Sequence, residues 1–224
     1  FIGNLAHELK TPIFSVQGYI LTLLEGALED PNINRNFLLK ASKNVDRLVM
    51  LTEDLDALTK FESSQLILNK ENFSLIELAT DIFDSLSYKA EQKKVNLKFF
   101  DDYETNFLVY ADKGMIAQVF TNLISNSIDY GKENGNTVVR LFDIDEQYLI
   151  EVKDDGIGID KEEQPRIFER FYRVDKSRSR HEGGSGLGLA IVKHILDAHN
   201  QSVSVTSVVG KGTTFSFSLP KAKK

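Results

Sequence analysis

The chain has 224 residues, which is room for one large domain or two small ones. Its hydrophobic content of 42% and charged content of 27% are ordinary for a globular protein, and the net charge of −6 argues against a dedicated nucleic-acid binder. Without cysteine, the chain has neither a disulfide framework nor a thiolate metal site. No apolar run reaches the roughly 20 residues of a membrane span.

The start of the chain carries neither a signal-peptide pattern nor a polar helix cap before Phe1. We therefore expect a cytoplasmic fragment cut within a helix, and any membrane segment would lie upstream.

Two apolar stripes with a spacing of three and four residues predict two long helices, over residues 1–29 and 37–62. The stretch "EDPNINRN" between them predicts a turn, so the helices should form an antiparallel hairpin. Because one hairpin cannot bury both stripes, we expect two copies to form a four-helix bundle, and hence a homodimer. The alternative is packing against the rest of the same chain. The stripes are Leu5, Leu9, Ile13, Val16, Ile20, Leu23 and Ala27, then Phe37, Ala41, Val45, Leu48, Leu51, Leu55 and Leu58.

The rest of the chain mixes helical and strand patterns, which predicts an α+β domain with helices covering one face of a sheet. Ser74 and Glu77 form a capping box at the start of one helix. The predicted helices are residues 74–93, 112–132 and 186–200, and the predicted strands are 95–100, 137–145, 148–155, 202–209 and 213–219.

The motif "AHELKTP" places His7 beside Glu8 in the first helix. The apolar stripe passes through Leu5 and Leu9, so His7 should point to solvent, with Thr11 one turn later on the same face. Glu8 can accept a hydrogen bond from one ring nitrogen and leave the other as a nucleophile. The alternative is a solvated helix with a chance His–Glu pair.

The motif "QVFTNLISNSIDYGK" places Asn122 and Asn126 on one face of a helix. Asn is a poor helix former and is rarely buried, so the pair indicates a polar function for these side chains, such as metal coordination or a ligand contact. The alternative is ordinary hydrogen bonding at a sheet edge.

The motif "KDDGIGID" ends a strand with carboxylates and turns through Gly156 and Gly158. Asp154 could accept a hydrogen bond from an exocyclic amine while the glycines let a flat ring approach the backbone. The acidic spacing is not that of an EF-hand. The alternative is a surface turn.

The stretch "RIFERFYRVDKSRSRHEGGSGLGLA" has six basic and two acidic residues between Arg166 and Arg180, followed by glycines at a helix start. Exposed N–H groups there suit phosphate, and a basic lid over a triphosphate fits the pattern. It is neither a P-loop nor a Rossmann fingerprint. A solvated charged loop would explain the charges but not the glycines.

The order and spacing of these motifs resemble those of bacterial two-component sensor histidine kinases, of the phosphate-regulon type. "FIGNLAHELKTP" is similar to the H box, "NLISNSIDYG" to the N box and "DDGIGI" to the first glycine box. "IFERFYR" is similar to the F box and "GGSGLGLAIV" to the second glycine box, and the closing "GKGTTFSFSLP" also matches. The resemblance covers essentially the whole chain.

By this resemblance His7 is the phosphoacceptor, and Glu8 is the base that orients and deprotonates it. Thr11 matches the threonine that positions water for dephosphorylating the partner, and Pro12 matches the family's helix kink. Asn126 would hold the Mg²⁺ that accompanies ATP. The other implied nucleotide contacts are Asn122, Tyr130, Asp154 at the adenine amine, Gly156, Gly158, Arg173 at the phosphates, Gly184, Gly186 and Gly188 as a lid hinge, Leu187 and Thr213.

One departure from the family pattern is Asp129, where the family usually has lysine. We expect its carboxylate to face the nucleotide side and repel a phosphate, which would weaken ATP binding unless Lys132 substitutes. Ser127 for alanine and Asp155 for asparagine are milder departures.

The resemblance implies a dimerisation and phosphotransfer domain (1–64) and a catalytic ATP-binding α/β sandwich (65–224). Its activity would be autophosphorylation of His7 from ATP, then phosphotransfer to an aspartate of a response regulator, with phosphatase activity towards it. The alternatives are a net phosphatase using Thr11, a nucleotide-binding scaffold with weak kinase activity, and a conformational ATPase of the gyrase and chaperone type.

Overall fold

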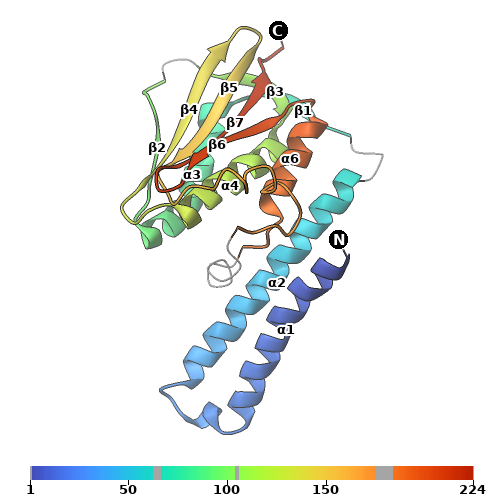
Figure 1. Ribbon diagram of the computed structural model, residues 1–224, viewed down its shortest axis with the longest axis vertical. Coiled ribbons are helices and arrows are strands. Elements are labelled where there is room, and N and C mark those ends of the chain that lie inside the picture. Colours follow the sequence, from blue (N-terminus) through green and yellow to red (C-terminus); the bar gives the residue numbers. More distant parts are fainter. Residues whose placement is uncertain (1, 63–66, 104–105, 175–183, 224) are drawn as a thin grey trace. The chain divides into compact units, whose positions relative to one another are not determined.

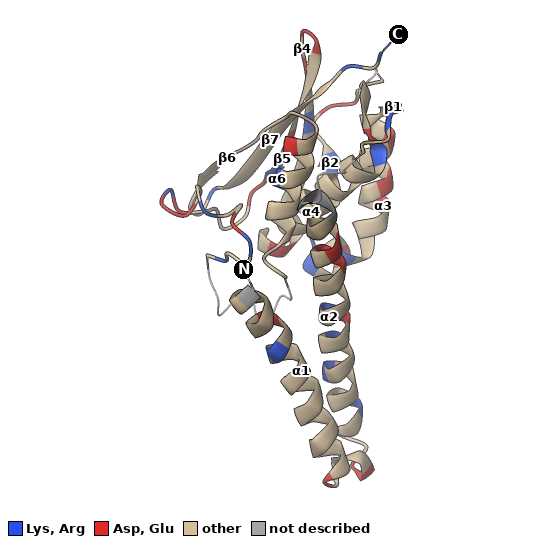
Figure 2. Ribbon diagram, turned by 90° about the vertical axis from the view of Figure 1, so that its right-hand side faces the viewer, with Lys and Arg blue, Asp and Glu red and all other residues tan. Residues whose placement is uncertain are grey.

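The first helices form the hairpin that the apolar stripes predict. In the computed structural model, α1 spans Ile2–Leu24 and α2 spans Asn34–Glu62, with the short 3-10 helix η1 (Ala27–Glu29) between them (Figure 1). The side chain of Asp30 stabilises the connection by accepting a hydrogen bond from the Asn32 N–H at 2.9 Å. Most of α1 is uncharged, as Figure 2 shows; its charged residues are Glu8 and Lys10.

The structure describes residues 2–62, 67–103, 106–174 and 184–223. It divides into two units, each treated by itself below: residues 1–60 with 170–188, and residues 61–169 with 189–224. Within the described residues, we find no helix long and apolar enough to cross a membrane.

The second unit is built on a five-stranded mixed sheet in the order β2-β4-β5-β7-β6. β2 pairs with β4 in parallel, and the other neighbours are antiparallel. The predicted strands all form with slightly different ends. They are β2 (Asn96–Phe99), β4 (Asn136–Ile144), β5 (Gln147–Asp154), β6 (Val203–Val208) and β7 (Gly212–Pro220).

Three helices cover one face of this sheet, as predicted: α3 (Leu75–Lys93), α4 (Lys113–Tyr130) and α6 (Gly188–Ala198) (Figure 1). α3 begins with the predicted cap, in which the Ser74 hydroxyl accepts from the Glu77 N–H. Apolar residues spaced by three and four in α4 meet the alternate inward residues of the strands. Phe120 and Phe217 illustrate this core, with ring centroids 5.9 Å apart and both side chains buried.

A second, two-stranded sheet was not predicted. β1 (Lys70–Ser74) and β3 (Leu108–Asp112) pair antiparallel, with Lys70 opposite Asp112. Only the last two residues of β1 are buried, so its sequence lacks the alternation that identifies a half-buried strand. Its pairing depends on a partner about 40 residues away in the chain, which local sequence does not reveal.

Candidate active site

His7 lies in α1 with its side chain exposed, which confirms the orientation predicted from the stripe. Thr11 follows one turn later, and its hydroxyl donates a hydrogen bond to the His7 carbonyl oxygen at 3.1 Å. Pro12 is buried inside the same helix, where it supplies no N–H to the carbonyl of Glu8. The helix therefore lacks one of its regular hydrogen bonds directly after the His–Glu pair.

The carboxylate of Glu8 contacts arginines rather than the His7 ring, which corrects the hydrogen bond expected from the sequence. Its Oε2 accepts from Nη2 of Arg47 at 2.8 Å and from Nη2 of Arg173 at 3.3 Å, all within the first unit. The two arginine side chains are only 11% and 8% exposed. A guanidinium is a stronger partner for a carboxylate than a neutral imidazole N–H, which explains the preference.

The two asparagines of α4 share one face of the helix at half-buried positions, as their spacing predicts. The opposite face is apolar and fully buried, with Leu123 and Ile124 at 0% exposure. Asn122 and Asn126 therefore lie outside the packed core, where their amide groups can meet a ligand. Tyr130, the last residue of α4, is 38% exposed.

Asp154 is the last residue of β5, and its side chain is 6% exposed. It follows the buried alternation of Ile150 and Val152, so it lies on the face of the sheet that the helices cover. Its Oδ1 accepts hydrogen bonds from the backbone N–H of Gly156 at 2.8 Å and of Thr213 at 3.1 Å. Burial raises the pKa of this carboxyl above its ordinary value of 3.8, although both hydrogen bonds act to lower it.

The glycines after Asp154 are required by packing. A Cβ at Gly156 would overlap the carbonyl oxygen of Tyr130, and one at Gly158, where φ is +73°, would overlap that of Val208. Both residues thus let the loop pass close to the end of α4 and the β6–β7 turn. Thr213 follows that turn, so one loop and one hairpin together fix the Asp154 carboxyl.

The glycine-rich segment before α6 lies in the first unit beside the end of the F-box stretch. The Phe171 N–H donates to the Gly186 carbonyl at 2.8 Å, and Arg173 also donates to the carbonyl of Gly184. Leu187 is fully buried, and α6 begins at Gly188. Of the six basic residues predicted to form a lid, Lys176, Arg178 and Arg180 lie outside the described residues, as does Gly183.

The expectation for Asp129 needs correction, because its carboxylate already has a cationic partner. Lys89 of α3 places its Nζ 2.7 Å from Oδ2 of Asp129 and 2.6 Å from the Ser125 hydroxyl. Lys132, the proposed substitute for the family lysine, donates instead to the Gly210 carbonyl at 3.0 Å. The repulsion expected between Asp129 and a phosphate is therefore offset by the Lys89 ammonium.

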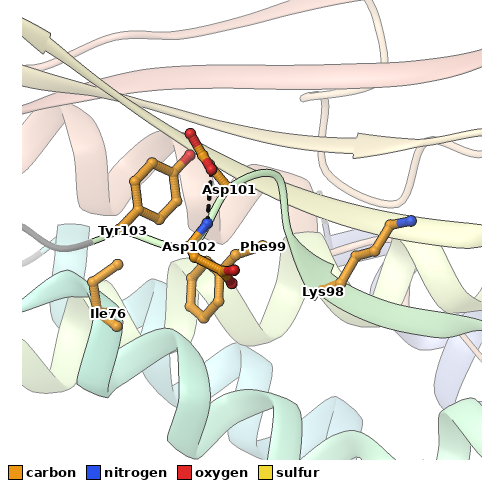
Figure 3. Close-up of a pocket in the computed structure, with 6 residues that line it drawn as sticks. All are labelled: Ile76, Lys98, Phe99, Asp101, Asp102 and Tyr103. Atoms are coloured by element: carbon orange, nitrogen blue, oxygen red, sulfur yellow. Dashed lines mark hydrogen bonds between the residues drawn. The ribbon is translucent and has the colours of Figure 1, made fainter.

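A cavity of about 450 Å³ lies between α3 and the end of β2, away from all predicted site residues (Figure 3). Its lining includes Ile76, Phe99 and Tyr103, and the Asp101 carboxylate there accepts from the Asp102 backbone N–H. The Tyr103 hydroxyl accepts from the Leu141 N–H at 2.8 Å, so this hydroxyl serves the fold. Among the described residues, no cluster of three or more His, Cys, Asp or Glu could hold a metal.

Sequence reasoning missed Arg47 and Lys89, which contact Glu8 and Asp129 across 39 and 40 residues. Neither belongs to a motif, and no local signal marks them. Predicting either contact would require knowing which helices pack together.

Comparison with known families accounts for both parts of the chain. Residues 111–223 match the family described as "Histidine kinase-, DNA gyrase B-, and HSP90-like ATPase", and residues 1–64 match the "His Kinase A (phospho-acceptor) domain". The chain belongs to the histidine kinase-, DNA gyrase B- and HSP90-like ATPase family. Together the two matches identify the catalytic core of a two-component sensor histidine kinase.

Individual relatives agree with this assignment. Sensor histidine kinase WalK of Bacillus subtilis (strain 168) is 38% identical over 222 residues, which make up 98% of this chain and 36% of WalK. Drug sensory protein A of Synechocystis is 37% identical over 98% of this chain, and the chain spans 34% of that protein. The chain therefore spans little more than a third of these relatives.

Solved structures share the fold. The structure of histidine kinase ThkA in complex with response regulator protein TrrA matches with a TM-score of 0.80 and 25% identity, covering 99% of this chain and 61% of that one. The fold class predicted from the sequence, a helical N-terminal region followed by an α/β sheet domain, is confirmed.

Proposed function

We propose that this chain catalyses ATP-dependent phosphorylation of its own His7 and then passes the phosphoryl group to an aspartate of a response regulator. The proposal rests on an exposed histidine that is followed in the sequence by a glutamate, on a helix that matches a phospho-acceptor domain. The same chain also contains an ATPase-family domain. The structure of ThkA with a response regulator supports the choice of partner.

The chemistry follows from the residues. One nitrogen of the neutral His7 ring attacks the γ-phosphorus of ATP, and the bond to the β–γ bridging oxygen breaks, so that ADP leaves with the electron pair. The proton on the other ring nitrogen passes to the Glu8 carboxylate, which acts as general base. The adenine amine would donate to Asp154, whose carboxyl is held by two backbone N–H groups.

The residues present fit a magnesium ion with its nucleotide. Asn126 offers a half-buried amide oxygen, a donor type that Mg²⁺ accepts, on the polar face of α4. The phosphates would supply further oxygens. When bound, Mg²⁺ would neutralise charge on the triphosphate. The other nucleotide contacts proposed from the sequence stay predictions, including Tyr130, Arg173 and the glycines 184, 186 and 188.

The hairpin would act as a homodimer. Large apolar side chains on both helices are about half exposed, among them Ile13 at 49%, Ile20 at 46% and Val45 at 46%. Exposed apolar area of this kind marks an interaction surface, and a second hairpin of the same sequence would cover it. The domain division at residues 64 and 65 is part of this proposal, and the family match over 1–64 supports it. A membrane-anchored parent protein also stays a prediction.

Phosphatase activity towards the response regulator would use Thr11, which lies one turn after His7. Thr11→Ala should then slow loss of phosphate from the regulator and leave autophosphorylation unchanged. An unchanged rate of loss would remove Thr11 from this role.

The deciding experiment is incubation with ATP labelled at the γ-phosphate, followed by acid and alkali treatment of the protein. We expect an acid-labile, alkali-stable label that is absent from His7→Gln and present in His194→Gln, the control on α6. Glu8→Gln should bind ATP but phosphorylate about 10²-fold more slowly, as expected for a lost general base. Label retained by folded His7→Gln would overturn the assignment.

A further inference from the structure

The carboxylate assigned above as general base is held from the opposite helix of its own hairpin. Arg47 lies in α2, 39 residues beyond Glu8, and its Nη2 donates to Oε2 of Glu8 at 2.8 Å. Both side chains are largely covered, with 11% of Arg47 and 25% of Glu8 exposed. This is a charge-assisted hydrogen bond between two helices, the kind that fixes a side chain in one orientation.

The burial of Arg47 favours persistence of its contact with Glu8. Its Nε is buried and has no hydrogen-bond partner within the described part of the chain, so the guanidinium is already incompletely paired. Removing Glu8 from it would leave a buried charge with still fewer partners, which is strongly unfavourable. The pair is therefore expected to stay together, with each side chain restricting the other.

We propose that Arg47 is a positioning residue for phosphorylation of His7: it holds the carboxylate of Glu8, the proposed general base, in one orientation. This inference rests on the proposed function, in which Glu8 accepts the ring proton. Arg173, from the segment before the glycine-rich stretch, also contacts Glu8, with its Nη2 at 3.3 Å. Arg47 makes the shorter contact and lies on the same hairpin as the base.

Two readouts distinguish positioning from a merely structural role. Without Arg47, the carboxylate would lose its shorter contact and could take other rotamers, and a small misplacement of a catalytic group can cost about 10²-fold in rate. The kcat should therefore fall while the KM for ATP stays unchanged. Arg47→Lys should restore part of the kcat, because it keeps the positive charge.

The test compares Arg47→Met and Arg47→Lys with Arg35→Met, a control at an exposed arginine of the same helix. Initial autophosphorylation rates are measured over ATP concentration in the full chain. For Arg47→Met we expect a kcat about 10²-fold lower and an unchanged KM for ATP. Arg47→Lys keeps the charge but loses the planar fork, so its kcat should be intermediate.

The outcomes separate the two proposals. A parent chain without acid-labile label on His7 would overturn the proposed function and this inference together. A labelled parent whose Arg47→Met variant keeps the parental kcat would overturn only the role of Arg47. If thermal melting shows that Arg47→Met does not fold, Arg47→Lys decides: a kcat equal to that of Arg35→Met overturns the proposal.

Discussion

The α1–α2 hairpin and the α/β unit differ in how completely they bury their apolar side chains. Phe120, Ile124 and Ile150 of the α/β unit are 0% exposed, whereas Ile13, Ile20 and Val45 of the hairpin are close to half exposed. The α/β unit thus has a complete core of its own, while the hairpin depends on a further surface. We expect the first region to tolerate isolation and the second to require assembly.

The same contrast appears in the two carboxylates assigned to chemistry. Asp154 is fixed by backbone N–H groups of its own loop and of the adjacent hairpin, and burial raises its pKa. Glu8 is fixed by guanidinium side chains. Backbone donors follow from the fold itself, whereas side-chain donors can be removed one at a time. The predictions below test this difference.

The largest effect is expected at Asn126. Asn126→Ala should lower Mg-ATP affinity by at least about 10²-fold, because removing even an indirect partner of a metal ligand costs 10–100-fold. The fold should persist, since the position is half-buried and alanine favours helix. Isothermal calorimetry measures the binding, and Gln118→Ala, two turns earlier on the same helix, is the control. Unchanged affinity would assign the metal to another residue.

Asp154→Asn should separate binding from stability. Asparagine can still accept both backbone N–H bonds through its oxygen, but it cannot offer a charged acceptor to the adenine amine. We expect ATP affinity to fall roughly tenfold to 10²-fold, the usual value of a hydrogen bond to a charged group. Undiminished affinity for ATP, measured by calorimetry, would exclude the adenine contact.

The stability of the same variant should depend on pH in a defined direction. The folded chain holds the Asp154 proton more tightly than the unfolded chain, which releases it near pH 4. Raising the pH from about 4 therefore costs stability until the folded carboxyl has also ionised. Asparagine has no such loss, so the free energy of unfolding of Asp154→Asn should rise relative to that of the parent as the pH increases above about 4. Urea unfolding at a series of pH values from about 4 upward measures this difference, and a constant difference would contradict the raised pKa.

The sequence predicted the features that depend on local pattern, and it missed those that depend on contacts between distant elements. Periodicity located α4, β5 and the loop with Asp154, because the signals are local and several agree. It did not find β1, where only the last two residues are buried, or β3, whose alternation is confined to a five-residue strand. Arg47 and Lys89 were also missed, because what they contact depends on helix packing rather than on neighbouring residues. The motif residues were thus predictable, and the side chains that hold two of them were not.

The hairpin surface can be tested by placing a charge on it. Ile20→Asp should raise the dissociation constant of the proposed dimer by roughly tenfold or more, because the carboxylate would have to be buried between the hairpins. Thr22→Asp, also exposed on α1 but off the apolar stripe, introduces the same charge as a control. Sedimentation equilibrium measures both dissociation constants. Equal constants for the two variants would mean that this stripe is not the dimer interface.

The smallest effect is expected at Asp129. From the sequence alone, its carboxylate should repel a triphosphate, and Asp129→Lys should tighten ATP binding about tenfold. The contact with Lys89 changes that expectation, because a carboxylate with an ammonium at 2.7 Å presents little net charge to a ligand. Asp129→Lys would also place two ammonium groups together.

The sharper variant is therefore Asp129→Asn. We expect it to change Mg-ATP affinity by less than about threefold, and equally at low and high salt, since little unscreened charge is removed. It should lower the free energy of unfolding by at most about 1 kcal/mol, because Lys89 is 38% exposed and partly exposed pairs contribute little. Lys89→Met should show a loss of the same size. A tenfold gain in affinity that is greatest at low salt would mean that Asp129 acts on the triphosphate despite its partner, as the sequence first indicated.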